Sequence, residues 1–203
     1  MTIPAAAQLG DQGSAAAGPE PDWARLTHDA KRERILDAAG RVFATDGLDA
    51  PMPAVAGAAG AGVASVYRQF PSKNDLLAAL VTRRLEQFRE AAVAAARRDG
   101  DRWTALTVML WTLVEHQSAD DFLGDAWDRV QDHPDVVAAS LLSTEAIDGL
   151  IAAAQAEGTL RVDATAIDIR LLFTATRAAK RVAPAGWRRM LTLLIDGLRA
   201  PTG

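Results

Sequence analysis

The chain has 203 residues, of which 49% are hydrophobic and 24% charged, the composition of an ordinary globular protein. It contains no cysteine, which excludes disulfides, thiolate metal ligands and thiol-based redox sensing. No uninterrupted apolar stretch approaches the roughly 18 residues that a membrane-spanning helix needs, and the N-terminal segment lacks the basic region and apolar core of a secretory signal. We therefore expect a cytoplasmic protein with no membrane partner.

The net charge of −4 is unevenly distributed. Residues 1–24 carry three acidic and no basic side chains, residues 25–98 carry 12 basic and 8 acidic ones, and residues 99–203 carry 10 basic and 15 acidic ones. The middle segment, at +4, is thus positive between two negative ones. This is a modest footprint for phosphate binding, which a solvated helical surface can also produce.

Helical periodicity begins after an Ala-, Gly- and Pro-rich segment, residues 1–24, which we expect to be a disordered tail. The first predicted helix has its N-cap at Asp29 and its C-cap at Gly47. A short second helix is predicted over 51–59, where proline suits the first turn. The glycine-rich turn 60–62 then leads into a third short helix over 63–70.

In the rest of the chain, capping residues, prolines and glycines again mark where helices are predicted to begin and end. Pro71 ends the third helix and Ser72 caps a long fourth one, while Asp101 and Asp163 are predicted to cap two later helices. Six further helices are predicted over 73–98, 101–117, 120–131, 134–158, 163–182 and 184–199. Nothing alternates with period two for long enough to indicate a strand, so we expect an all-α fold of about nine helices.

Two segments carry motifs that can be compared with known families. They read Arg34-Ile-Leu-Asp-Ala-Ala, Val42-Phe, Gly47, Val55-Ala-x-x-Ala59-Gly60, Val66-Tyr67-x-x-Phe70-x-Ser72-Lys73-x-x-Leu76 and, near the C-terminus, Trp187-Arg-Arg with Leu194-Ile-Asp-Gly-Leu198. The N-terminal segment resembles the DNA-binding domain of the TetR family of transcriptional regulators. The C-terminal segment is similar to the last helix of actinobacterial members.

The resemblance implies a one-component regulator, more often a repressor, that binds a palindromic operator on double-stranded DNA as a homodimer. A small-molecule ligand would release it. The expected domains are a three-helix helix-turn-helix domain over residues 25–75 and a helical ligand-binding and dimerisation domain over residues 76–203. No cofactor is implied.

The third predicted helix is the candidate recognition helix, because a short helix set across another by a glycine turn can enter a major groove about 12 Å wide. The candidate DNA-binding residues are Gly62, Val63, Ala64, Ser65, Tyr67, Arg68, Gln69 and Lys73. Tyr67 and Lys73 are expected to contact phosphates. Arg68 can contact either bases or phosphate, and the sequence leaves both open. A plain three-helix packing unit with a half-buried Tyr67 is the structural alternative.

Basic residues near the first helix, Arg25, Lys31 and Arg32, can reach the DNA backbone or a minor groove, or can be solvated charges. Because the recognition helix is otherwise Val, Ala and Ser, we expect sequence preference to depend on thymine methyl contacts and DNA shape.

Aromatic and apolar residues from several C-terminal helices are candidates for a pocket that takes an apolar or amphipathic organic ligand. They are Phe88, Trp103, Leu110, Trp111, Trp127 and Phe173, each of which can equally belong to the core. The resemblance also implies dimerisation through the last two helices. The candidate interface residues are Ile167, Leu171, Ala178, Leu191, Leu194, Ile195 and Leu198.

Other polar groupings indicate no catalytic or metal site. Asp120, Asp121 and Asp125 have the spacing of a magnesium site, but acidic residues also favour a helix N-terminus. His116 and His133 have no partner at metal-ligand spacing. We therefore expect no enzyme, and the alternative functions are a helical ligand carrier or an interaction protein without DNA binding.

Overall fold

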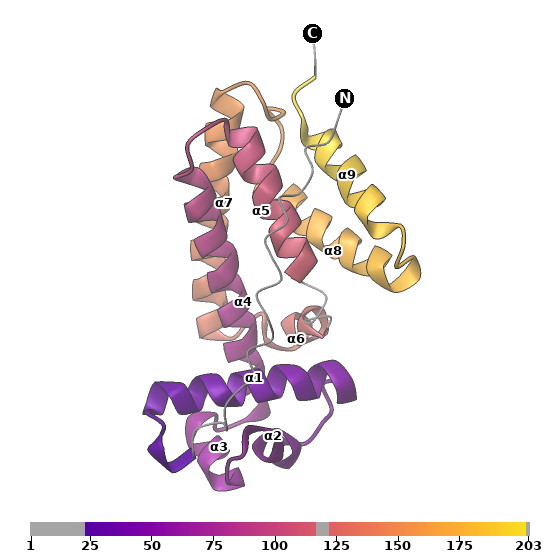
Figure 1. The fold of residues 1–203 in the computed structure, drawn as a ribbon. Coiled ribbons are helices and arrows are strands. Elements are labelled where there is room, and N and C mark those ends of the chain that lie inside the picture. Colours follow the sequence, from indigo (N-terminus) through magenta and orange to yellow (C-terminus); the bar gives the residue numbers. More distant parts are fainter. Residues whose placement is uncertain (1–22, 117–121, 202–203) are drawn as a thin grey trace, which may run out of the picture.

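The helices of the computed structural model begin and end near the capping residues, prolines and glycines of the sequence, and the structure describes residues 23–116 and 122–201. The α-helices are α1 (His28–Asp46), α2 (Met52–Ala59), α3 (Val63–Gln69), α4 (Lys73–Ala96), α5 (Arg102–His116), α6 (Leu123–Val130), α7 (Pro134–Ala156), α8 (Ala166–Val182) and α9 (Trp187–Leu198). Nine helices and no strand among the described residues confirm the predicted all-α fold (Figure 1).

Two predicted N-caps are wrong. α1 is capped by Thr27 and not by Asp29, because the Thr27 hydroxyl accepts a hydrogen bond of 3.2 Å from the backbone N–H three residues later. α8 is capped by Thr165, which forms a capping box with the carboxylate three residues later. Asp163 does not take this role, since its carboxylate binds the Arg161 guanidinium at 2.8 Å. Each prediction chose the wrong one of two nearby capping residues.

The first three helices form a compact end of the molecule, which we call the reading head, with α1 lying across α2 and α3 (Figure 1). Its core is formed by apolar side chains that α1 to α3 bury together with the first half of α4. Residues of α6 and the start of α7 join the same core, among them Phe122, Ala126, Val130 and Val136. The reading head therefore shares this core, which we call the head core, with α4, α6 and α7.

A second core lies in the other half of the molecule, where α4 and α7 run side by side, α5 and α8 pack against this pair, and α9 packs against α8 (Figure 1). Its fully buried side chains include Leu106, Leu110, Leu150, Ile169 and Leu191. The expected boundary between the two domains, at residues 75 and 76, falls inside the continuous helix α4.

The last two residues of the expected tail, Trp23 and Ala24, belong to a short 3-10 helix, Trp23–Arg25. The rest of that tail, residues 1–22, lies outside the described residues. The Trp23 ring packs against the head core and lies 5.9 Å from the ammonium of Lys31. An aromatic ring can anchor a segment whose composition otherwise indicates disorder.

Among the described helices, α7 alone is long and apolar enough to cross a membrane, and 28% of its most apolar stretch is buried in the chain. Core helices of soluble proteins have the same length and composition. Three apolar side chains of α7, Val137, Leu141 and Leu142, are exposed on the single chain.

Candidate DNA-binding and ligand-binding sites

The turn between α2 and α3 is held by an arginine from α1. Gly60 adopts a left-handed conformation, with φ of 64°, which ends α2 without the strain that a side chain would cause. The Arg34 side chain donates a hydrogen bond of 2.8 Å from Nε to the Ala59 carbonyl. A Cβ atom on Gly60 would lie 3.0 Å from Nη2 of the same arginine. Arg34 thus fixes the angle between α2 and α3. Arg34 belongs to the sequence motif, but the spacing of the motif residues did not reveal this role.

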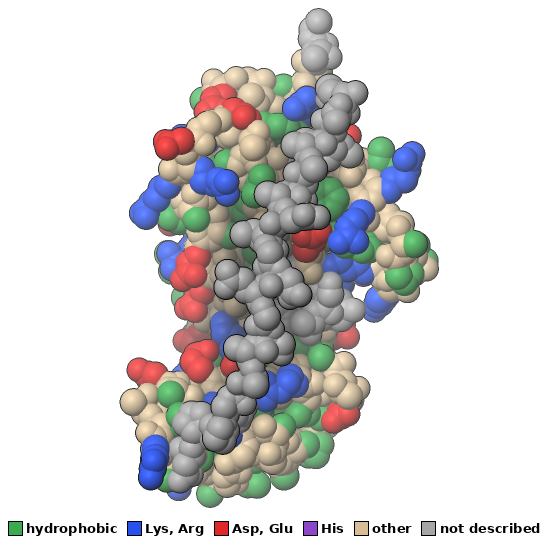
Figure 2. Space-filling view, viewed as in Figure 1, with side chains coloured by type: hydrophobic (Ala, Val, Ile, Leu, Met, Phe, Trp, Pro, Cys, Tyr) green, Lys and Arg blue, Asp and Glu red, His purple; other side chains and the backbone are tan. Residues whose placement is uncertain are grey.

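The outer surface of α3 is exposed and largely uncharged. Val63 and Tyr67 are 40% and 44% exposed, and Gly62, Ala64 and Arg68 are exposed beside them. On the inner side, Val66 and Phe70 are buried in the head core, while Ser65 and Gln69 are half-buried. All seven predicted residues of the recognition helix and its cap thus lie at the surface or its margin. Figure 2 shows hydrophobic and uncharged side chains over much of this end of the molecule in the view drawn.

The only charged side chain of α3 is oriented by a neighbour on the same helix. Arg68 donates a hydrogen bond of 2.8 Å from Nη2 to the Ser65 hydroxyl, one turn earlier. The contact directs the guanidinium along the exposed side of α3, and a guanidinium has further donors available for a base or a phosphate. These remaining donors of Arg68 can meet either a base edge or a phosphate oxygen.

Three other basic residues lie against aromatic rings, namely Lys31 and Arg32 of α1 and Lys73 at the start of α4. The Lys73 ammonium is 5.7 Å from the centre of the Phe43 ring and the Arg32 guanidinium is 4.5 Å from that of Phe70. Such contacts hold a cation in place while leaving it donors for an anion. Lys31 and Arg32 were expected either to bind DNA or to be solvated, and packing on a ring is a third role.

The start of α4 is fixed by a capping box. The Ser72 hydroxyl accepts from the Asp75 N–H at 3.2 Å, and the Asp75 carboxylate accepts from the Ser72 N–H at 2.8 Å. Hydrogen bonding by the Ser72 side chain is the main cause that holds the pKa of Asp75 below its ordinary value of 3.8. Because the folded pKa is the lower one, this carboxylate stabilises the fold above pH 3.8 and ceases to do so as the pH falls through its folded pKa.

We expect Ser72→Ala to lower the free energy of unfolding by about 1 kcal/mol at pH 7, the usual worth of an N-cap. The difference from wild type should shrink at a pH low enough to protonate the wild-type carboxylate, which must lie below 3.8 because the folded pKa of Asp75 is lowered. Urea unfolding at the two pH values measures this. Thr45→Ala is the control, since the Thr45 hydroxyl only donates to its own helix, to Arg41 O at 3.1 Å. A loss that is equal at both pH values would contradict the role given to Asp75.

Polar contacts join the reading head and the start of α4 to later helices at three places. Arg83 of α4 binds Asp37 of α1 at 2.7 Å, and Arg129 of α6 binds Asp49 at 3.2 Å. The third contact joins the His133 Nε2 atom at the start of α7 to the Asp75 carboxylate at 3.4 Å. His133 also caps α7, since its Nδ1 atom accepts a hydrogen bond from the Asp135 N–H at 3.3 Å. Asp120 and Asp121 lie outside the described residues, which contain no cluster of three His, Asp or Glu side chains that could hold a metal ion.

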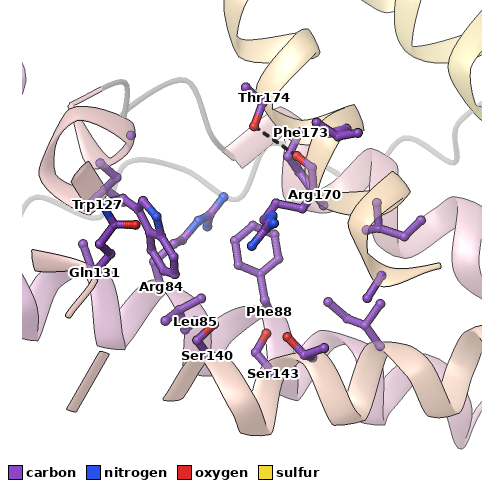
Figure 3. Close-up of a pocket in the computed structure, with 18 of the residues that line it drawn as sticks. Arg84, Leu85, Phe88, Trp127, Gln131, Ser140, Ser143, Arg170, Phe173 and Thr174 are labelled. Carbon is purple, nitrogen blue, oxygen red and sulfur yellow. Dashed lines mark hydrogen bonds between the residues drawn. The ribbon is translucent and has the colours of Figure 1, made fainter. Parts of the chain in front are cut away.

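A cavity of about 660 Å³ opens between α4, α6, α7 and α8 (Figure 3). It is lined by Val81, Arg84, Leu85, Phe88, Leu123, Gly124, Trp127, Asp128, Gln131, Ser140, Ser143, Thr144, Ile147, Ala166, Ile167, Ile169, Arg170, Leu171, Phe173, Thr174 and Arg177. This volume lies within the range of roughly 300 to 1,000 Å³ that small-molecule sites occupy.

Three of the six predicted pocket residues line this cavity, namely Phe88, Trp127 and Phe173. The other three, Trp103, Leu110 and Trp111, do not line it and pack in or against the second core. The Trp111 ring, for example, lies 6.2 Å from that of Trp187 on α9. Helical periodicity places all six on apolar faces, but it does not say which neighbouring helix covers each face.

The polar lining of the cavity was not predicted. It includes the arginines Arg84, Arg170 and Arg177 and a single acidic residue, Asp128. Arg177 lies against the first turn of α6, where a Cβ atom on Gly124 would be only 1.4 Å from its Nη1 atom. The spacing of Arg170, Thr174 and Arg177, at i, i+4 and i+7, was the signal available in the sequence.

The predicted interface residues fall into two groups. Four of them are at least partly accessible on the single chain: Ile167 and Leu171 are each 58% exposed, Ala178 is exposed and Leu194 is half-buried. These four side chains can therefore contact a second chain. The remaining three are a correction, because they lie in the second core of the single chain: Leu191, Ile195 and Leu198, at 0%, 5% and 8% exposure. The outward apolar residue of α9 that the prediction missed is Leu193, which is 58% exposed.

Comparison with known proteins assigns both halves of the chain. Residues 35–80 match the N-terminal domain of bacterial regulatory proteins of the tetR family, and residues 101–200 match the SbtR-like C-terminal domain of transcriptional regulators. The HTH-type transcriptional repressor KstR of Mycolicibacterium smegmatis is 30% identical over 131 residues, which are 63% of this chain and 64% of that protein.

Solved structures show the same fold. A TetR transcription regulatory protein from Mycobacterium vanbaalenii is 30% identical, with a TM-score of 0.61 over 83% of this chain and 95% of that one. SmeT of Stenotrophomonas maltophilia in its complex with triclosan is 23% identical, with a TM-score of 0.59 over 83% of this chain and 89% of that one. The likeness to SmeT concerns the fold alone.

Proposed function

We propose, from the premise that the chain belongs to the TetR family of bacterial regulatory proteins, that it is a cytoplasmic transcriptional repressor. In this proposal it binds a palindromic operator as a homodimer and leaves the DNA when a small organic molecule binds. The observation that carries the proposal is the reading head, in which α3 is exposed along one side while Val66 and Phe70 anchor its other side.

In this proposal, different residues contact the bases and the phosphate backbone of the DNA. With α3 in the major groove, Val63 and Ala64 can touch thymine methyl groups, and Arg68 is the one cation of α3 that can reach base edges. Tyr67 and Lys73 would hold the backbone on either side, since a hydroxyl and an ammonium are suited to phosphate oxygens. Sequence preference then depends on few hydrogen bonds and more on methyl contacts and DNA shape.

We expect the purified protein to bind a site in the DNA upstream of its own gene, and Lys73→Ala to weaken binding to all sequences alike. The loss of one phosphate contact should reduce the slope of log affinity against log salt by about one. Arg68→Ala should instead cost about 1–3 kcal/mol at particular base pairs, if its contact is bidentate. Binding to single-base operator variants at several salt concentrations measures both effects.

Arg97→Ala provides the control, because Arg97 lies at the opposite end of α4 from Lys73. It should change neither the salt slope nor the base preference. If Lys73→Ala relaxed specificity at one base pair while Arg68→Ala weakened all sites equally, the two roles would be reversed. Failure of the wild type to bind any DNA specifically would favour a ligand-binding or interaction protein instead.

The exposed apolar side chains of the last two helices support a homodimer. Ile167, Leu171 and Ala178 follow one another along α8 at helical spacing, and Leu193 and Leu194 are neighbours in sequence on α9. Monomeric proteins rarely leave large contiguous apolar surfaces exposed. Two-fold symmetry would place the two reading heads on successive major grooves, so the half-sites should be about one helical turn or slightly more apart.

Helix α6 can connect the cavity to the reading head. One face of α6 buries Ala126 and Val130 in the head core, and the ring of the preceding Phe122 lies 5.9 Å from that of Phe43. The other face contributes Trp127 to the cavity. A ligand that moved Trp127 would therefore move α6 against α1, and allosteric coupling of about 1–3 kcal/mol is typical of such devices.

A further inference from the structure

The cavity has an apolar interior. Phe88 of α4 and Phe173 of α8 meet edge to face with ring centres 4.8 Å apart, and Leu85 and Trp127 also line the space. Figure 3 shows these side chains around one cavity, with Ser140 and Ser143 on the α7 side and Arg170 on the α8 side. An interior of this kind favours the hydrocarbon or aromatic body of a ligand.

The three arginines of the lining differ in what already occupies them. Arg84 donates from Nη2 to the Leu113 carbonyl at 3.1 Å and stacks on the Phe88 ring at 4.8 Å. Arg177 is packed against α6. The Arg170 guanidinium, in contrast, forms no hydrogen bond or ion pair within residues 23–116 and 122–201. It is exposed and lines the cavity.

A second polar group in the cavity also lacks a protein partner. Ser143 is 4% exposed, and its hydroxyl forms no hydrogen bond with any residue that the structure describes. A hydroxyl in a cavity lining that has no protein partner is available for water or a ligand. Together, Arg170 and Ser143 provide hydrogen-bond donors on two sides of an apolar space.

We infer that the cavity binds an amphipathic anion, whose carboxylate or phosphate head is held by Arg170 and whose apolar body lies against Phe88 and Trp127. This inference rests on the proposed function, since it names the ligand class of the proposed sensor. Three arginines against one aspartate make the lining positive, and guanidinium groups bind both kinds of anion in bidentate fashion. Because Arg170 is exposed, the head would lie towards solvent and the body inward, against the apolar lining.

The experiment measures binding of defined probes to the full-length protein without DNA, by isothermal titration calorimetry below their micelle-forming concentrations. The probes are dodecanoate, dodecyl phosphate and the neutral dodecanamide. We expect one or both anions to bind at least tenfold more tightly than the amide, because a hydrogen bond to a charged group is worth about tenfold to a hundredfold in affinity. The stronger anion identifies the head group.

Arg170→Gln should reduce the affinity for the anions about tenfold or more and leave that for dodecanamide unchanged. Arg181→Gln is the matched control, because Arg181 is exposed on the same helix but does not line the cavity. The inference is overturned if the amide binds as tightly as the anions, or if the two variants behave alike. It is also overturned if no probe binds at millimolar concentration to a preparation that binds its operator, and in that case the regulator function still stands. A preparation that binds the anions but no operator would contradict the regulator function alone.

Discussion

We expect Leu193→Arg to convert the protein from a dimer into a monomer and to lower its operator affinity by a factor of about 10² to 10⁴. The second effect follows because the two reading heads of a dimer bind as a linked pair, and separating them removes the high effective concentration of the second head. Leu193 is 58% exposed on the single chain, so an arginine there should not disturb the subunit fold. In an interface, the same arginine would be a buried charge without a partner.

Thr192→Arg is the matched control, because Thr192 is the adjacent exposed residue and turns away from Leu193 on α9. It should remain dimeric. Sedimentation velocity at micromolar concentration gives the assembly state, and the operator titration gives the affinity. A monomeric wild type, or a Leu193→Arg variant that stays dimeric with unchanged affinity, would contradict the proposed interface.

Local sequence signals predicted the reading head well because each one acts within a few residues. Gly60 needs a left-handed conformation to end α2, Pro71 cannot continue α3, and the Ser72 hydroxyl can reach only the N–H groups just after it. The errors were also local. At the starts of α1 and α8, two capping residues stand two positions apart. At α8, the local ion pair of Arg161 with Asp163 occupies the Asp163 carboxylate, so Thr165 caps the helix.

The cavity and the dimer surface could be predicted only in part because their residues depend on contacts between distant helices. An apolar stripe on α9 must be buried, but the sequence does not say whether its own chain or a second one covers it. Leu191 is covered by the second core, whereas Leu193, two residues on, is exposed. In the same way, Trp111 faces Trp187 and not the cavity. Arg170 was missed because a charged residue on a helix is normally solvated.

The last expected result concerns the shared core of the reading head and α6. We expect Phe43→Ala to lower the free energy of unfolding by about 3–5 kcal/mol, the usual cost of truncating a buried phenylalanine. Phe43 is 1% exposed, and its ring contacts both the Phe122 ring and the Lys73 ammonium. The cavity left behind would loosen α1 against α4 and α6, so operator affinity should also fall while the protein is still folded.

Leu106→Ala separates this effect from general destabilisation. Leu106 is fully buried on α5 in the second core, and its truncation should cost about 2–5 kcal/mol without affecting the reading head. Urea unfolding measures the loss of unfolding free energy in each variant. Operator titration, at a temperature where both variants are folded, compares their affinities for DNA. If Leu106→Ala weakened operator binding as much as Phe43→Ala, the two cores would act as one unit. α6 would then not be the particular connection between cavity and head, because any loss of packing would reach α3.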